Sequence, residues 1–157
     1  MEKGQSLEQA LEFGRMQERT YYGYDTTGVF SHADLVANFN GLRFWMALTP
    51  NGKLGLDDPL TGEKLKPYFK CQDGKWSLVR EFDWMEYIDH GWEEHINCSN
   101  FKGEKNQNII SKNIKKLMDE NKMAGQNHCP VFPKFCVDLT SKYGQLSTSL
   151  LHPVCQR

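Results

Sequence analysis

Apolar residues near the start of the chain repeat at helical spacing. Leu7 and Leu11 fall on one face of a helix, one turn apart. Ser6 and Gln9 at the start of this segment form a capping box in which each side chain can bond the other residue's backbone N–H. The pattern therefore predicts a helix over 7–19.

A second helix is predicted over 31–48. Ser31 is a favourable N-cap residue, and Pro50 disfavours helix at the residue before it, so the helix should end near Leu48. The apolar stripe of this helix, aromatic residues included, is expected to lie in the core. It comprises Leu35, Phe39, Leu42 and either Trp45 or Met46.

The middle of the chain has the pattern of a β-hairpin. Two short segments rich in aromatic and apolar residues flank Asp73-Gly74, and an Asp-Gly pair readily adopts the positive φ angles of a tight hairpin turn. A hairpin is therefore predicted near 68–80. The next apolar segment, 82–96, is ambiguous, because it fits a helix that Gly91 would interrupt.

Helical periodicity returns in the last third of the chain. Ile110, Ile114, Leu117 and Met118 share one face of a helix predicted over 104–123. A shorter helix is predicted over 134–143. The elements together predict an α+β fold, mostly α-helical with one small β-hairpin, in a single compact domain spanning 1–157.

Composition is consistent with one folded domain and excludes some partners. The chain has 157 residues, of which 39% are hydrophobic and 25% charged, enough to form a core. Its net charge of −1 removes the general electrostatic argument for binding nucleic acid, and the lysine-rich segment 102–122 contains neither Arg nor Trp. No apolar run is long enough for a transmembrane segment. We expect no nucleic-acid partner.

Cysteine and histidine crowd into the second half of the chain, where eight of the ten lie between His90 and Cys155. Five cysteines are many for a reducing cytosol, which favours disulfides and an oxidising compartment. Four cysteines allow three pairings, and we prefer Cys98–Cys129 with Cys136–Cys155. Cys71 would then be a small buried apolar residue in the hairpin.

A metal site is the alternative for the same residues. Two His-x-x-Cys pairs, His95 with Cys98 and His152 with Cys155, could give a tetrahedral zinc site in a metal-stabilised cytosolic domain. The pairs are 57 residues apart, however, and the chain has no Cys-x-x-Cys. We therefore expect no metal and no cofactor.

A hydrolase is a second alternative. Six acids and no Lys or Arg lie between Glu81 and His95, among several aromatic residues. An acidic and aromatic cleft around Asp83, Glu86 and His90 could provide paired carboxylates for hydrolysis, and would bring these groups together with perturbed pKa values.

The pattern as a whole favours a non-catalytic exported domain of binding or structural role, stabilised by disulfides and acting on another protein. A periplasmic or secreted location is favoured, with a leader absent from this sequence. A cytoplasmic location, and a chain that is a fragment of a longer protein, stay open.

Overall fold

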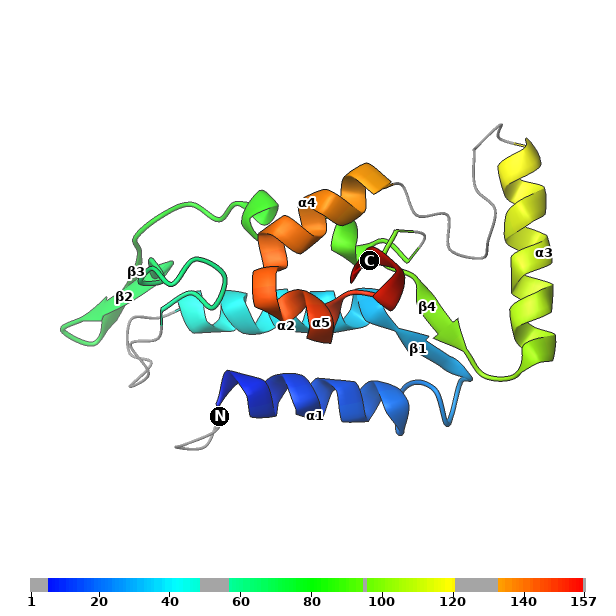
Figure 1. The fold of residues 1–157 in the computed structure, drawn as a ribbon. Coiled ribbons are helices and arrows are strands. Elements are labelled where there is room, and N and C mark those ends of the chain that lie inside the picture. Colours follow the sequence, from blue (N-terminus) through cyan, green and yellow to red (C-terminus); the bar gives the residue numbers. More distant parts are fainter. Residues whose placement is uncertain (1–5, 49–56, 95, 121–132, 157) are drawn as a thin grey trace.

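Helices make up most of the fold, and two small antiparallel sheets complete it (Figure 1). The computed structural model describes residues 6–48, 57–94, 96–120 and 133–156. The helices are α1 (Leu7–Arg19), α2 (His32–Leu48), α3 (Glu104–Glu120), α4 (Pro133–Tyr143) and α5 (Ser147–Leu150). The strands are β1 (Val29–Ser31), β2 (Phe69–Gln72), β3 (Lys75–Leu78) and β4 (Ser99–Phe101). The mostly helical α+β class predicted from the sequence is confirmed.

Local sequence signals account for the helix starts. The Ser6 hydroxyl accepts a hydrogen bond from the Gln9 N–H, and the Gln9 side chain accepts one from the Ser6 N–H, so the capping box is present. The Ser31 hydroxyl likewise accepts from the backbone N–H of Asp34 at the start of α2. The helix predicted over 104–123 is helical to Glu120, and the rest of that range lies outside the described residues.

The ambiguous segment 82–96 contains no long helix. It forms two 3₁₀ turns, η1 (Trp84–Glu86) and η2 (His90–Trp92). Asp83 and Asp89 each use the side chain to accept a hydrogen bond from the N–H two residues ahead, which stabilises short turns. Gly91 in η2 is buried against Val36, and a Cβ atom there would lie 3.1 Å from the valine side chain.

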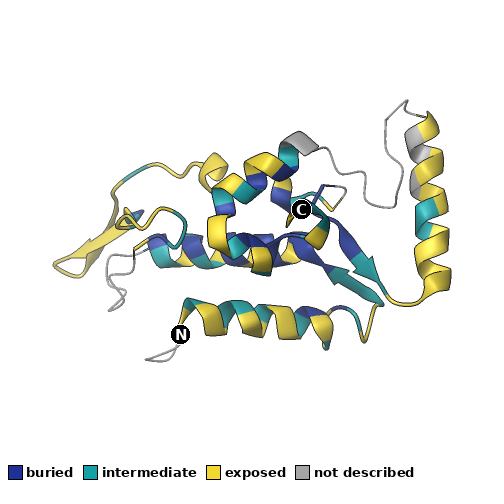
Figure 2. Ribbon diagram, viewed as in Figure 1, coloured by how far each residue is buried: buried dark blue, intermediate teal, exposed yellow. Residues whose placement is uncertain are grey.

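The core surrounds α2, which α1, α4, α5 and η2 contact or cover (Figures 1 and 2). Its buried residues come from α2, from the segment before β4 and from the C-terminal elements: Leu35, Val36, Phe39, Ile96, Cys136, Leu139, Tyr143, Leu150, Leu151 and Cys155. A smaller cluster of Ala47, Tyr68 and Tyr87 lies at the C-terminal end of α2. A disulfide between Cys136 and Cys155, with Cα atoms 4.9 Å apart, ties the C-terminal turn to α4 within the main core.

Two predictions about burial are wrong. Trp45 is 70% exposed, because the second half of α2 turns Asn40, Arg43 and Ala47 inward and leaves Trp45 on the opposite face. Cys71 is exposed, because the hairpin of β2 and β3 projects from the end of the molecule and neither of its faces is covered (Figure 2).

Candidate functional site

The hairpin and the residues that lead into and out of it form an arm at one end of the molecule, opposite α3 (Figure 1). We call residues 64–80 the hairpin arm. Its turn residues Asp73 and Gly74 have φ angles of 50° and 74°, as the Asp-Gly signal predicts for a two-residue hairpin turn. Because the turn fixes the strand register, it also fixes which side chains share a face.

The two faces of the hairpin differ in chemistry. Phe69 pairs with Leu78 and Cys71 pairs with Trp76, and cross-strand partners point to the same side of a sheet. This face is therefore apolar, whereas the opposite face carries Lys70, Gln72, Lys75 and Ser77. All eight strand residues are exposed, and Trp76 and Leu78 expose 58% and 59% of their surface.

Further apolar side chains are exposed beside the arm. Val79 follows β3 within the arm, and Phe82, Trp84 and Met85 follow the arm, with Met85 75% exposed. The Phe82 ring lies 4.6 Å from the Trp84 ring and 5.4 Å from the Tyr68 ring, so these side chains adjoin the base of the arm. Large exposed apolar patches mark interaction sites in soluble proteins.

Tyr68 anchors the arm to the body. It is 1% exposed, and its backbone N–H donates to the carbonyl of Ala47 at 2.8 Å. The Arg80 guanidinium lies 3.7 Å above the Tyr68 ring and makes an ion pair with Glu86, with Nη2 2.9 Å from Oε2. The Tyr68 hydroxyl donates to the same carboxylate oxygen at 2.9 Å. These contacts hold both ends of the hairpin in place.

The electrostatics of the anchor follow from these bonds. Hydrogen bonding to Arg80 lowers the pKa of Glu86, and the same contact raises the pKa of Arg80. Burial, with hydrogen bonds to Tyr87 and Glu86, raises the pKa of the Tyr68 hydroxyl. Glu86 is therefore a fixed anion that holds the arm.

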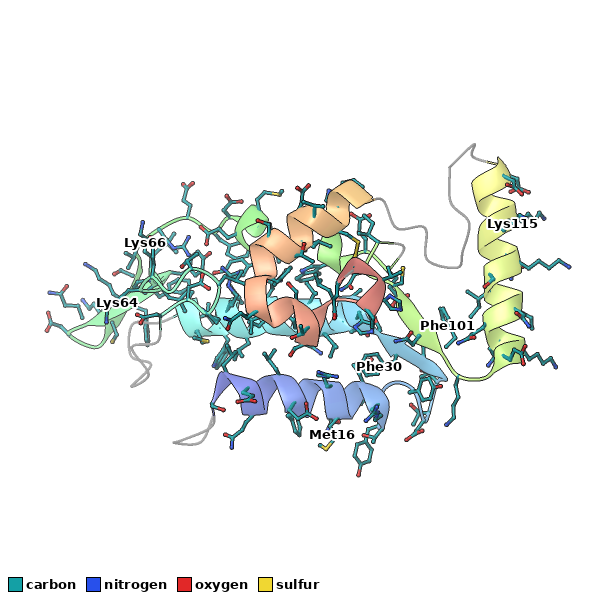
Figure 3. All side chains as sticks on the ribbon, viewed as in Figure 1. Met16, Phe30, Lys64, Lys66, Phe101 and Lys115 are labelled. Carbon is teal, nitrogen blue, oxygen red and sulfur yellow. A yellow bond between two sulfur atoms is a disulfide. The ribbon has the colours of Figure 1, made fainter. Side chains whose placement is uncertain are left out.

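The arm is also strongly basic. Residues 64–80 contain five basic residues and one acid, Asp73, in a chain whose net charge is −1. Figure 3 shows Lys64 and Lys66 beside the hairpin. Since Arg80 is neutralised by Glu86, the excess charge comes from the four lysines, of which Lys70 and Lys75 lie on the face opposite to the apolar one.

The predicted hydrolase residues have separate partners. Asp83 caps η1 by accepting from the Met85 N–H at 2.9 Å, and Glu86 is bound to Arg80. His90 lies 2.7 Å from a Glu93 oxygen and its ring is 4.2 Å from the Phe135 ring. None of the three predicted residues lines the described cavity between α1 and α2.

The cysteines and histidines of the predicted metal set also have partners. Cys155 is bonded to Cys136, the pairing that the sequence analysis preferred, and Cys98 is disulfide-bonded as well. His152 lies 3.1 Å from the Asn100 side chain. His95 and Cys129 lie outside the described residues.

The described residues form neither a metal-binding group nor a membrane-spanning helix. Within them, no group of three or more His, Cys, Asp or Glu side chains is arranged to hold a metal ion. Across the same part of the chain, no helix combines the length and apolarity that crossing a bilayer requires.

Sequence reasoning found the hairpin but missed its exposed apolar face. The alternation of Phe69, Lys70, Cys71 and Gln72 was the available signal, since strict alternation indicates one apolar and one polar face. Whether anything covers the apolar face depends on the tertiary arrangement, which strand patterning does not determine.

Comparisons of the chain with protein-family models, with curated proteins and with solved structures found no match.

Proposed function

We propose that the chain is a non-catalytic, exported binding domain that contacts another protein through the apolar face of the hairpin arm. The observation that carries the proposal is the exposure of Phe69, Trp76 and Leu78 on one face of a hairpin whose base is anchored. Aromatic and large aliphatic side chains on a preorganised element are typical of protein interfaces. An uncovered face of this kind gains hydrophobic free energy when a partner covers it.

The charge of the arm suggests the chemistry of the partner. Lys70 and Lys75 lie on the reverse of the apolar face, and Lys66 lies three residues before β2. A partner with an apolar hollow and an acidic rim would match both properties, and opposite charges speed association.

Export is supported by the disulfides. Cys136 and Cys155 are bonded inside the core, and Cys98 is bonded too. Structural disulfides persist in the periplasm and outside the cell, and are rare in a reducing cytosol.

A binding role is favoured over hydrolysis because Glu86 is engaged. A general acid must hold a proton near neutral pH, whereas the hydrogen bond from Arg80 lowers the pKa of Glu86. This keeps Glu86 in its ionised form.

Site-specific crosslinking tests the proposal. A photo-crosslinking residue at Leu78 should capture a defined protein in cells of the native source, and one at Val137, an exposed apolar position on α4, should not. The captured protein, once purified, should bind the wild-type chain and lose affinity at least about tenfold for Trp76→Ser/Leu78→Ser.

Control variants distinguish specific binding through the arm from nonspecific hydrophobic binding. Val137→Ser and Ile109→Ser remove apolar surface elsewhere and should leave the affinity unchanged. Equal capture at Leu78 and Val137, or binding of the arm to anionic lipid vesicles with no protein partner, would contradict the proposal.

A further inference from the structure

We propose that the cavity between α1 and α2 binds a small organic cation: a primary ammonium group carried on an apolar chain or ring. This site goes beyond the protein contact proposed for the hairpin arm and rests on different residues.

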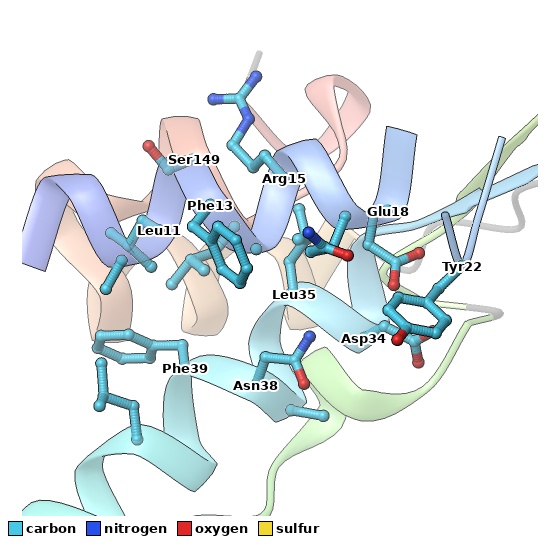
Figure 4. Close-up of a pocket in the computed structure, with 16 residues that line it drawn as sticks. Leu11, Phe13, Arg15, Glu18, Tyr22, Asp34, Leu35, Asn38, Phe39 and Ser149 are labelled. Carbon is cyan, nitrogen blue, oxygen red and sulfur yellow. The ribbon is translucent and has the colours of Figure 1, made fainter. Parts of the chain in front are cut away.

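The cavity has the size and lining of a small-molecule site. Its volume is about 520 Å³, within the range of roughly 300–1,000 Å³ that ligand pockets occupy. Leu11 from α1 and Leu35 and Phe39 from α2 supply apolar wall, and α5 contributes Leu150 (Figure 4). A ligand with an apolar body would bury that body against these side chains.

Two carboxylates lie together at one end of the cavity. Glu18 is near the end of α1 and Asp34 is in the first turn of α2, and Figure 4 shows them side by side, away from Leu11. The loop after α1 fixes Glu18, since the Tyr24 N–H donates to its carbonyl at 2.7 Å. Ser31 fixes Asp34 by capping its helix.

The carboxylates are short of positive charge. Burial and the nearby Asp34 raise the pKa of Glu18, and burial and Glu94 raise the pKa of Asp34. Arg15 is the one basic residue among those that line the described cavity, and it extends away from both carboxylates (Figure 4). A bound cation would relieve the repulsion that raises these pKa values.

An aromatic ring completes the acidic end. Tyr22 is 74% exposed and its ring lies beside Glu18 and Asp34 (Figure 4). Aromatic faces attract ammonium groups, and the ring can close over a bound cation while its hydroxyl stays in water. Carboxylates, a ring and an apolar groove together match an amphipathic cation better than a neutral or anionic ligand.

Titration calorimetry on the full, oxidised chain tests the charge and the apolar parts separately. Hexylammonium should bind, and hexanol and hexanoate, which have the same chain length, should bind at least about tenfold more weakly. Butylammonium, two methylenes shorter, should also bind about tenfold more weakly. Equal binding of hexylammonium and hexanol, or tighter binding of hexanoate, would overturn the proposal.

Variants place the ligand in the cavity. Glu18→Gln and Asp34→Asn should each weaken hexylammonium binding by about 10- to 100-fold. Glu12→Gln, on α1 but outside the cavity lining, should leave it unchanged. Thermal melting of each variant shows whether the fold is retained.

The pH dependence has a defined sign. Hexylammonium should bind more tightly as pH rises through the raised pKa values of Glu18 and Asp34, because only the ionised carboxylates attract it. The other charged groups near them are Glu94, which raises the pKa of both carboxylates, and Arg15, which also lines the cavity. Binding that survives both carboxylate variants would overturn the site, whereas Trp76→Ser/Leu78→Ser should bind hexylammonium normally and so separates the two proposals.

Discussion

The guanidinium of Arg43 and the carboxylate of Asp58 form a two-pronged ion pair: Nε lies 2.9 Å from Oδ1, and Nη2 lies 2.6 Å from Oδ2. Both side chains are about nine-tenths buried. Arg43 also donates to the Asn40 side chain at 2.8 Å, and Asn40 donates to the Tyr143 hydroxyl at 2.9 Å. The Tyr143 hydroxyl donates in turn to Asp89 at 2.7 Å. A continuous polar network thus crosses α2 from the 57–64 loop to α4.

Arg43→Ala should lower the free energy of unfolding by about 3–5 kcal/mol, because it leaves Asp58 buried without its partner. Arg43→Met/Asp58→Leu removes both charges and should recover most of that loss. Urea unfolding followed by circular dichroism measures both values. A loss below about 1 kcal/mol in Arg43→Ala would show that the buried pair does not stabilise the fold.

Acidification should destabilise the protein through His32. Burial, with His152 and Arg15 nearby, lowers the pKa of His32 to about 4, and among the described residues its Nδ1 has no hydrogen-bond partner. Well above pH 6.5 the ring is neutral in the folded and unfolded chains alike. As pH falls from about 6.5 to about 4, the unfolded chain binds a proton that the folded chain does not, so stability decreases by about 2–3 kcal/mol.

The comparison that isolates this effect is the free energy of unfolding at pH 7 and pH 4.5. His32→Gln should lose less stability between the two than the wild-type chain does. Glu18 and Asp34 act in the opposite sense, because their raised pKa values favour the folded state at acid pH. An unchanged pH dependence in His32→Gln would contradict the assignment.

Features with local causes were predictable from the sequence. The capping box of Ser6 and Gln9 and the Asp73-Gly74 turn each involve residues within three positions of one another, so their signals can be read along the chain. Arg43 and Asp58 gave no such signal, because they are 15 positions apart in the sequence and only folding brings them together.

The acidic end of the cavity was likewise not predictable from the sequence. Glu18 and Asp34 face each other because of how α1 packs on α2 and how the loop between them folds back. Helical periodicity predicted that both helices exist. It does not determine which of their polar residues meet.

Gly23→Ala should destabilise the fold by more than about 2 kcal/mol. A Cβ atom at Gly23 would lie 1.8 Å from the backbone oxygen of Glu18, so the loop would have to move off the end of α1. Gly14→Ala is the matched control within α1: no atom lies within 4 Å of its Cβ position, and the change should stabilise the helix by about 0.5–1 kcal/mol. Thermal unfolding of both variants tests the pair, and equal effects would contradict the packing argument.

Removing the disulfide between Cys136 and Cys155 should lower stability substantially. The bond closes a loop with a sequence separation of 19, for which restriction of the unfolded chain predicts about 3 kcal/mol. Cys136→Ala/Cys155→Ala should show this loss in urea unfolding, whereas Cys71→Ser, at an exposed free thiol, should show none. Alkylation followed by intact mass measurement on protein purified without reductant should label Cys71 and leave Cys136 and Cys155 unlabelled. Labelling of all three would mean that the cysteines are reduced in the native protein. That result would contradict both the disulfide and the oxidising compartment inferred from it.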